Sequence, residues 1–107
     1  MLNDQASNMA DAASISVEMQ GYVHRAAEPW IAGDTVKAGL LRASRQTGLQ
    51  YRRVRTLWYR QTLAISAFEA DTLRAWNRRW LASQKARLQA RLEQMEMEWQ
   101  ATGGADE

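Results

Sequence analysis

The chain has 107 residues, which suffices for one small hydrophobic core, and its formal net charge is only +2. Because it contains no cysteine, disulfides and thiolate metal sites are excluded. No stretch approaches the ~18 consecutive apolar residues of a transmembrane helix, and the start of the chain does not resemble a signal peptide. We therefore expect a cytoplasmic protein with no membrane partner.

The first 34 residues combine an alanine-rich start with one amphipathic helix. Residues 1–14 show no apolar stripe, and we expect a flexible arm there. Ser16 should cap the first helix, and Glu28-Pro29 should end it, because a residue before proline avoids the helical region. Asp34, which follows Gly33, should cap the next helix. The face predicted to be buried carries Ile15, Met19, Tyr22, Val23, Ala26 and Trp30.

The segment that follows is strongly basic. No acidic side chain occurs from Thr35 to Phe68. The same span contains seven basic residues, which are Lys37, Arg42, Arg45, Arg52, Arg53, Arg55 and Arg60. A cluster of one sign is typical of a surface that binds a polyanion. The alternative is that these arginines only solubilise a helix.

The spacing from Val36 to Gln61 predicts two short helices joined by a tight turn at Gly48. Small or apolar residues on one face of the first helix are Val36, Leu40, Ala43, Ser44 and Thr47. Leu49 follows the glycine as an apolar residue of the turn, and the second helix continues the pattern with Val54, Leu57 and Trp58. These faces can pack together only if the chain reverses at Gly48.

Leu40 to Tyr59 resembles the helix-turn-helix unit of Cro/repressor-like regulators of bacteria and phages, as found in small prophage-like proteins. Ser44 takes the position of its small residue, Gly48 that of its turn glycine, and Val54 and Leu57 those of its buried recognition-helix residues. Two positions depart from the pattern. Thr47 replaces an apolar residue, and Gln50 replaces a small turn residue.

The resemblance implies that the helix over residues 50–61 enters the major groove of DNA. Its outward residues, which we predict to contact bases, are Gln50, Tyr51, Arg52, Arg55, Thr56 and Tyr59. The remaining basic residues, which we predict to contact phosphates, are Lys37, Arg42, Arg45, Arg53 and Arg60.

The rest of the chain predicts one long helix. Ser66 and Glu69 form a capping box, and neither glycine nor proline interrupts the stretch from Ala67 to Ala101. Phe68, Leu73, Trp76 and Trp80 are expected to pack on the helix-turn-helix. A second apolar stripe, formed by Leu88, Leu92, Met95 and Trp99, predicts self-association, most simply as a homodimer with coiled-coil character. Alternatively, this part folds back as a final core helix.

We therefore predict an all-α helix-turn-helix bundle of about four helices. Residues 15–80 should form the DNA-binding domain, 81–101 a self-association helix and 102–107 a disordered tail. The sequence shows no glycine-rich phosphate loop, paired carboxylate motif or nucleophile–base arrangement, so we expect no enzyme, cofactor or small-molecule ligand. His24, the single histidine, predicts no metal site.

Three functions are compatible with this predicted fold and its basic surface. The first is a sequence-specific, dimeric transcriptional regulator that binds double-stranded DNA at the nucleoid. The second is a phage DNA-packaging subunit, similar to a small terminase, which should form a ring. The third is a protein-interaction adaptor that uses its basic face, whose binding should be indifferent to DNA sequence.

Overall fold

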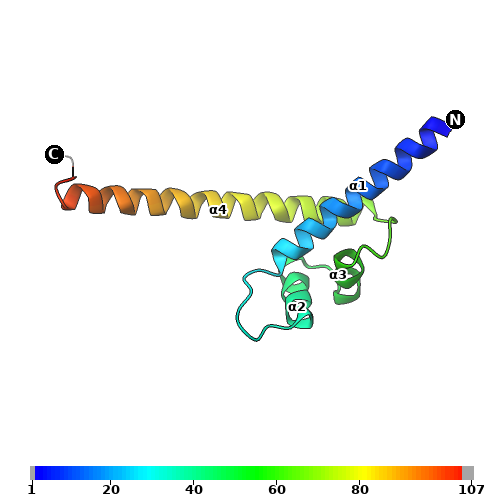
Figure 1. Ribbon diagram of the computed structural model, residues 1–107, viewed down its shortest axis with the longest axis horizontal. Helices are drawn as coiled ribbons and strands as arrows, with labels where there is room; N and C mark the ends of the chain where they lie inside the picture. The colour runs from blue at the N-terminus through cyan, green and yellow to red at the C-terminus, as the bar shows by residue number, and fades with distance from the viewer. Residues whose placement is uncertain (1, 105–107) are drawn as a thin grey trace. The chain divides into compact units, whose positions relative to one another are not determined.

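Four α-helices make up the computed structural model, which describes the backbone of residues 2–104 and the side chains of residues 10–104 (Figure 1). They are α1 (Leu2–Ala26), α2 (Val36–Thr47), α3 (Tyr51–Trp58) and α4 (Ala67–Ala101). The described residues contain no strand, so the predicted all-α class is confirmed. They divide into two units between Trp76 and Asn77. The first unit holds α1, α2, α3 and the start of α4, and the second holds the rest of α4.

The core of the first unit forms where one face of each helix meets the others. Met19 and Val23 come from α1, and both are fully buried. The α2–α3 pair and the first turns of α4 supply further apolar core residues, which include Leu40, Ala43, Val54, Leu57, Leu73 and Trp76. The helical spacing of these residues is what allows each helix to bury one stripe and leave the other in water.

The start of α1 differs from the prediction. The helix begins at Leu2, not near Ser16, because residues 2–20 contain no glycine or proline and four alanines favour the helical state. Ser16 is therefore no cap. It is buried inside the helix, where its hydroxyl faces the guanidinium of Arg60 at 3.4 Å. Met1 lies outside the described residues.

The entry into α2 also differs from the prediction. Thr35, not Asp34, is the N-cap, and its hydroxyl accepts a hydrogen bond from the Ala38 amide at 3.1 Å. Asp34 instead closes the preceding loop, where its carboxylate accepts a hydrogen bond from the Ile31 amide at 3.0 Å. Val36 was predicted to be buried but is exposed. It shares a face with Leu40 and Ala43, but it is the first residue of α2 and stands at the end of the buried stripe.

The predicted turn at Gly48 is confirmed. Gly48 has a φ of +79°, a left-handed conformation that costs glycine little, and its amide donates to the Ser44 carbonyl at 2.9 Å. The departure at Thr47 has a physical reason. Its side chain is buried, and its hydroxyl donates to the Ala43 carbonyl at 2.7 Å and accepts from the Leu49 amide at 3.3 Å. The Ser44 hydroxyl donates to the Leu49 carbonyl at 2.6 Å.

The second helix is shorter than predicted, since α3 ends at Trp58 and not at Gln61. Arg60 adopts a φ of +52° and donates its amide to the Leu57 carbonyl, while the Gln61 amide reaches back to Thr56 at 3.0 Å. This pair of bonds is a Schellman ending, a motif in which the left-handed residue is usually glycine.

The capping box and the extent of α4 are confirmed. The Glu69 amide donates to the Ser66 hydroxyl, and the Ser66 amide donates to the Glu69 carboxylate, both at 3.1 Å. Leu73 and Trp76 are buried as predicted, whereas Trp80 belongs to the second unit. The prediction for Phe68 was wrong. Its side chain is 74% exposed, because Ala70 and Leu73 form the buried face of this turn.

The end of α4 is ordered as far as it is described. The Thr102 amide donates to the Glu98 carbonyl at 3.0 Å, and Gly103, with a φ of +72°, closes the last turn. Gly104 lies against the Trp99 ring so closely that an added Cβ would stand 2.5 Å from it. Residues 102–104 thus form a helix ending, whereas 105–107 lie outside the described residues.

Candidate nucleic-acid interface

The candidate interface is the outer side of the α2–α3 pair. Gly48 fixes the reversal between the two helices, and Leu40, Ala43, Val54 and Leu57 hold their inner faces in the core. With the inner face fixed in this way, the 3.6-residue period determines which α3 residues face water.

The six residues predicted to contact bases divide by exposure. Gln50, Arg52, Arg55 and Tyr59 are exposed, whereas Tyr51 and Thr56 are half-buried. Gln50 and Tyr59 cap the two ends of α3 and lie just outside it. The Thr56 hydroxyl donates to the Arg52 carbonyl at 2.9 Å, so it already has a partner within the helix.

Arg52 and Arg55 direct their charge to solvent. No group among the described residues accepts a hydrogen bond or forms an ion pair with either guanidinium. The first turn of α3 contains no acidic residue, and no side chain caps its amides. The positive end of the helix and two unengaged guanidinium groups are therefore available to an anion.

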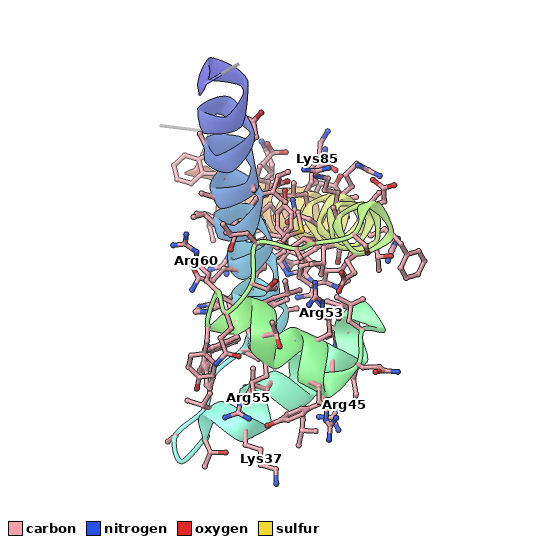
Figure 2. All side chains as sticks on the ribbon, turned by 90° about the vertical axis from the view of Figure 1, so that its right-hand side faces the viewer. Lys37, Arg45, Arg53, Arg55, Arg60 and Lys85 are labelled. Carbon is pink, nitrogen blue, oxygen red and sulfur yellow. The ribbon has the colours of Figure 1, made fainter. Side chains whose placement is uncertain are left out.

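Lys37 and Arg45 extend this basic surface onto α2. Both side chains are exposed, and neither pairs with a group that the structure describes. Figure 2 shows Lys37, Arg45 and Arg55 projecting from the α2–α3 pair on the side away from α1. We call Lys37, Arg45, Arg52 and Arg55 the outer basic surface.

Arg42 has a structural role that the sequence did not reveal. Its Nε donates to the Ala27 carbonyl at 2.6 Å, and its Nη2 donates to the Asp34 carboxylate at 2.9 Å. Its guanidinium also lies 5.3 Å from the centre of the Trp30 ring, which favours a cation–π contact. Arg42 thus fastens the loop between α1 and α2 to α2. The hydrogen bond from the Ile31 amide, followed by that from Arg42, lowers the pKa of Asp34.

Arg53 likewise points inward, as Figure 2 shows by its position away from the outer basic surface. Its Nε and Nη2 both donate to the Glu69 carboxylate, the latter at 2.9 Å, and Nη2 also donates to the Ala64 carbonyl at 2.6 Å. Burial raises the pKa of Glu69, but the hydrogen bonds from Arg53 and Ser66 outweigh this effect, and the pKa lies below its ordinary value. Arg53 therefore joins α3 to the start of α4.

Arg60 lies apart from the outer basic surface, beside α1 (Figure 2). It is exposed except for its contact of 3.4 Å with Ser16. The structure thus brings two of the five predicted phosphate-contacting residues, Lys37 and Arg45, beside the predicted base-contacting helix. The phosphate contacts themselves stay a prediction for all five.

Two supporting contacts behind the interface were missed from the sequence. Arg74 of α4 donates to both oxygens of Glu18 in α1, at 2.8 and 3.0 Å, and the Tyr22 hydroxyl donates to the same carboxylate at 2.7 Å. The Arg74 hydrogen bonds lower the pKa of Glu18. The His24 ring stacks on Trp58 with 3.8 Å between ring centres. Glu18 and Arg74 are 56 positions apart, so no local pattern could have paired them.

The chain matches no family model, no curated protein and no solved structure. Along the described residues, no helix combines the length and apolar character needed to span a membrane. No group of three or more His, Cys, Asp or Glu residues in that part of the chain could hold a metal ion. Functional inference therefore depends on the chemistry of the outer basic surface.

Proposed function

We propose that this chain is a sequence-specific DNA-binding protein, a transcriptional regulator of bacterial or prophage type, that places α3 in the major groove. The observation that carries the proposal is the outward, unpaired position of Arg52 and Arg55 on a helix held by a glycine-linked partner helix. Arginine can donate two parallel hydrogen bonds to O6 and N7 of guanine, and glutamine can do the same with adenine. Arg52, Arg55 and Gln50 would therefore read bases.

The phosphate contacts would come from the two ends of α2. Lys37 in its first turn and Arg45 in its last turn are exposed and lie on the same side as Arg55. Such contacts fix the position of a protein on the duplex without reading its sequence. The guanidinium groups of Arg42 and Arg53 already donate hydrogen bonds to groups within the fold, so only some of their N–H groups are available to DNA. We therefore expect their contribution to DNA binding to be small.

Self-association through α4 is the second part of the proposal. Leu88, Leu92, Met95 and Trp99 share one side of the helix and are 62, 59, 55 and 59% exposed. An apolar stripe of this length is normally covered by a partner. Two copies would present two reading helices, which allows recognition of a palindromic site.

Selection of bound sites from a random duplex library tests the proposal. We expect an enriched motif with two inverted halves, and we expect Arg55→Ala to lose the preference at one position of each half. Arg79→Ala, which removes the same charge from the second unit, serves as the control and should leave the motif unchanged. An unenriched library would contradict sequence-specific binding and favour the adaptor function. A ring-sized mass in solution would favour the packaging function.

A further inference from the structure

We propose that two copies of the chain pair through the second unit with their α4 helices antiparallel. This inference depends on the self-association proposed above but not on DNA binding. It concerns only residues 77–102, and it follows from how apolar and charged side chains are distributed along this part of α4.

One face of this part of α4, which we call the seam, carries residues spaced alternately four and three positions apart. The positions are Leu81, Lys85, Leu88, Leu92, Met95 and Trp99, and all six side chains are exposed. This 3.5-residue period is that of a two-helix seam. Lys85 is the single polar member. The period itself does not distinguish a parallel from an antiparallel pair.

Charge does distinguish them, because it is segregated along the helix. The segment from Asn77 to Arg91 contains no acidic residue. Its five basic residues are Arg78, Arg79, Lys85, Arg87 and Arg91. From Leu92 to Ala101 there are three acidic residues and no basic one, namely Glu93, Glu96 and Glu98. No ion pair joins these two groups within the described part of the helix.

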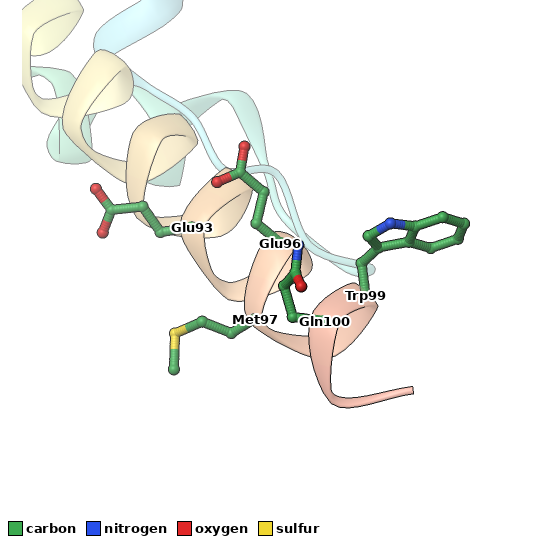
Figure 3. Close-up of a pocket in the computed structure, with 5 residues that line it drawn as sticks. All are labelled: Glu93, Glu96, Met97, Trp99 and Gln100. Atoms are coloured by element: carbon green, nitrogen blue, oxygen red, sulfur yellow. The ribbon is translucent and has the colours of Figure 1, made fainter. Parts of the chain in front are cut away.

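The acidic end carries its charge beside the exposed seam. Figure 3 shows Glu93, Glu96 and Trp99 projecting from the last turns of α4. The open hollow at this place is lined by Glu93, Glu96, Met97, Trp99 and Gln100, all from the same helix. Of these, Trp99 belongs to the seam and Glu96 flanks it, whereas the other three lie farther round the helix. A second helix laid on the seam would therefore contact the Trp99 ring with an acidic side chain beside it.

A parallel pair would place each residue beside its own counterpart. Lys85 would then face Lys85 of the second copy inside the apolar seam, and no acidic residue from Asn77 to Arg91 offsets that charge. Like charges at close range disfavour association, and their desolvation in a seam adds to the cost. An antiparallel pair instead lays the basic segment along the acidic one, and it also opposes the two helix dipoles.

One antiparallel register covers the whole seam. Centred on residue 90, it places Leu88 opposite Leu92 of the second copy and Leu81 opposite Trp99 of the second copy. The stem of Lys85 then lies along Met95 of the second copy, with its amine in the acidic segment, as long cationic side chains commonly pack. In the same register Lys85 lies close to the level of Glu96 and Glu98 of the second copy, which flank the seam on its two sides.

Spin-label distances in the full chain test the orientation, and the absence of native cysteine makes single labels specific. Ala90→Cys and Gln100→Cys are both exposed and outside the seam. With ~1.5 Å rise per residue, the antiparallel register gives a short distance at position 90 and an axial separation of about 30 Å at position 100. A parallel pair gives short distances at both positions and would overturn the proposal, as would a chain that stays monomeric by light scattering at all concentrations.

Charge reversal gives an independent test. Lys85→Glu and Glu96→Lys should each weaken the dimer about fivefold, since each places like charges together twice per dimer, and the double variant should restore the original Kd. Arg79→Glu, which faces no acidic residue in this register, is the matched control and should change the Kd less. Absence of rescue would contradict the register. Because neither test uses DNA, failure here is distinguishable from failure of the DNA-binding proposal.

Discussion

Arg53 of α3 and Glu69 of α4 form a two-pronged ion pair, and the same carboxylate accepts the Ser66 amide that begins α4. The two side chains are 30% and 14% exposed, so the pair is partly shielded from water. Arg52, the preceding residue, points outward and has no partner among the described residues. Adjacent arginines on one short helix thus serve different purposes. One joins α3 to α4, and the other leaves its charge exposed to solvent.

The first prediction separates these roles by substitution. Arg53→Ala should lower the free energy of unfolding by about 1–3 kcal/mol, because it leaves a partly buried carboxylate without its charged donors. Arg52→Ala should change stability by no more than about 0.5 kcal/mol, since an exposed unpaired side chain is removed. Chemical denaturation of both variants checks this. Equal losses of stability would show that Arg53 does not brace the fold.

The second prediction concerns DNA. Arg55→Ala should cost about 1–3 kcal/mol on the selected site and relax the preference for one base pair. Arg45→Ala should weaken binding to every duplex alike and reduce the slope of log K against log salt by about one unit. Fluorescence anisotropy on selected and random duplexes across a salt series measures both. Identical behaviour of the two variants would contradict the division between base-reading and phosphate-contacting residues.

The third prediction is loss of stability in acid. Glu18, Asp34 and Glu69 have ordinary pKa values of 4.5, 3.8 and 4.5, and the fold lowers all three. The unfolded chain therefore binds protons at a higher pH than the folded chain does. The stabilisation from these carboxylates is complete at a pH above their ordinary pKa values. It is lost as the pH falls through the lowered pKa values of the folded state. Thermal unfolding should show a steady Tm from pH 7 to about 5 and a falling Tm below it.

A glutamine at position 69 is the control for the acid effect. Glu69→Gln retains a side chain that can complete the capping box but removes the charge paired with Arg53. The variant should have a lower Tm at pH 7 and a shallower fall in acid than the wild type. If Tm falls equally steeply with pH in the variant and in the wild type, Glu69 does not contribute to the pH dependence.

The parts of this fold that could be predicted are those fixed by local chemistry. Gly48 and the Ser66–Glu69 box mark helix ends through contacts within a few residues, and the helical period identified Val54 and Leu57 as buried. The same period placed Arg52 and Arg55 on the outside, where the structure has them.

The rest depended on contacts between distant segments. The roles of Arg42 and Arg53 are set by acceptors 8 to 16 positions away, and sequence alone does not show which basic residue finds an acid. Phe68 fits an apolar pattern, yet the neighbouring stripe of Ala70 and Leu73 meets the core instead. Such outcomes require the packed arrangement of helices, since several registers of one helix satisfy its own pattern.

The last prediction concerns Arg60, which ends α3 in a left-handed conformation at a φ of +52°. An L-residue with a side chain loses roughly 1 kcal/mol there, whereas glycine adopts it freely. Arg60→Gly should therefore raise the free energy of unfolding by up to about 1 kcal/mol, since the 3.4 Å contact with Ser16 that it removes is long and weak. Arg60→Ala, which keeps the unfavourable φ and removes the same charge, is the matched control and should not be stabilising. If both variants lose stability equally, the side chain of Arg60 contributes more through Ser16 than its backbone costs. Both variants lack the Arg60 guanidinium, so their affinity for a DNA duplex reports the loss of that charge alone. If Arg60 contacts a phosphate, both variants should bind the duplex more weakly, and to the same extent.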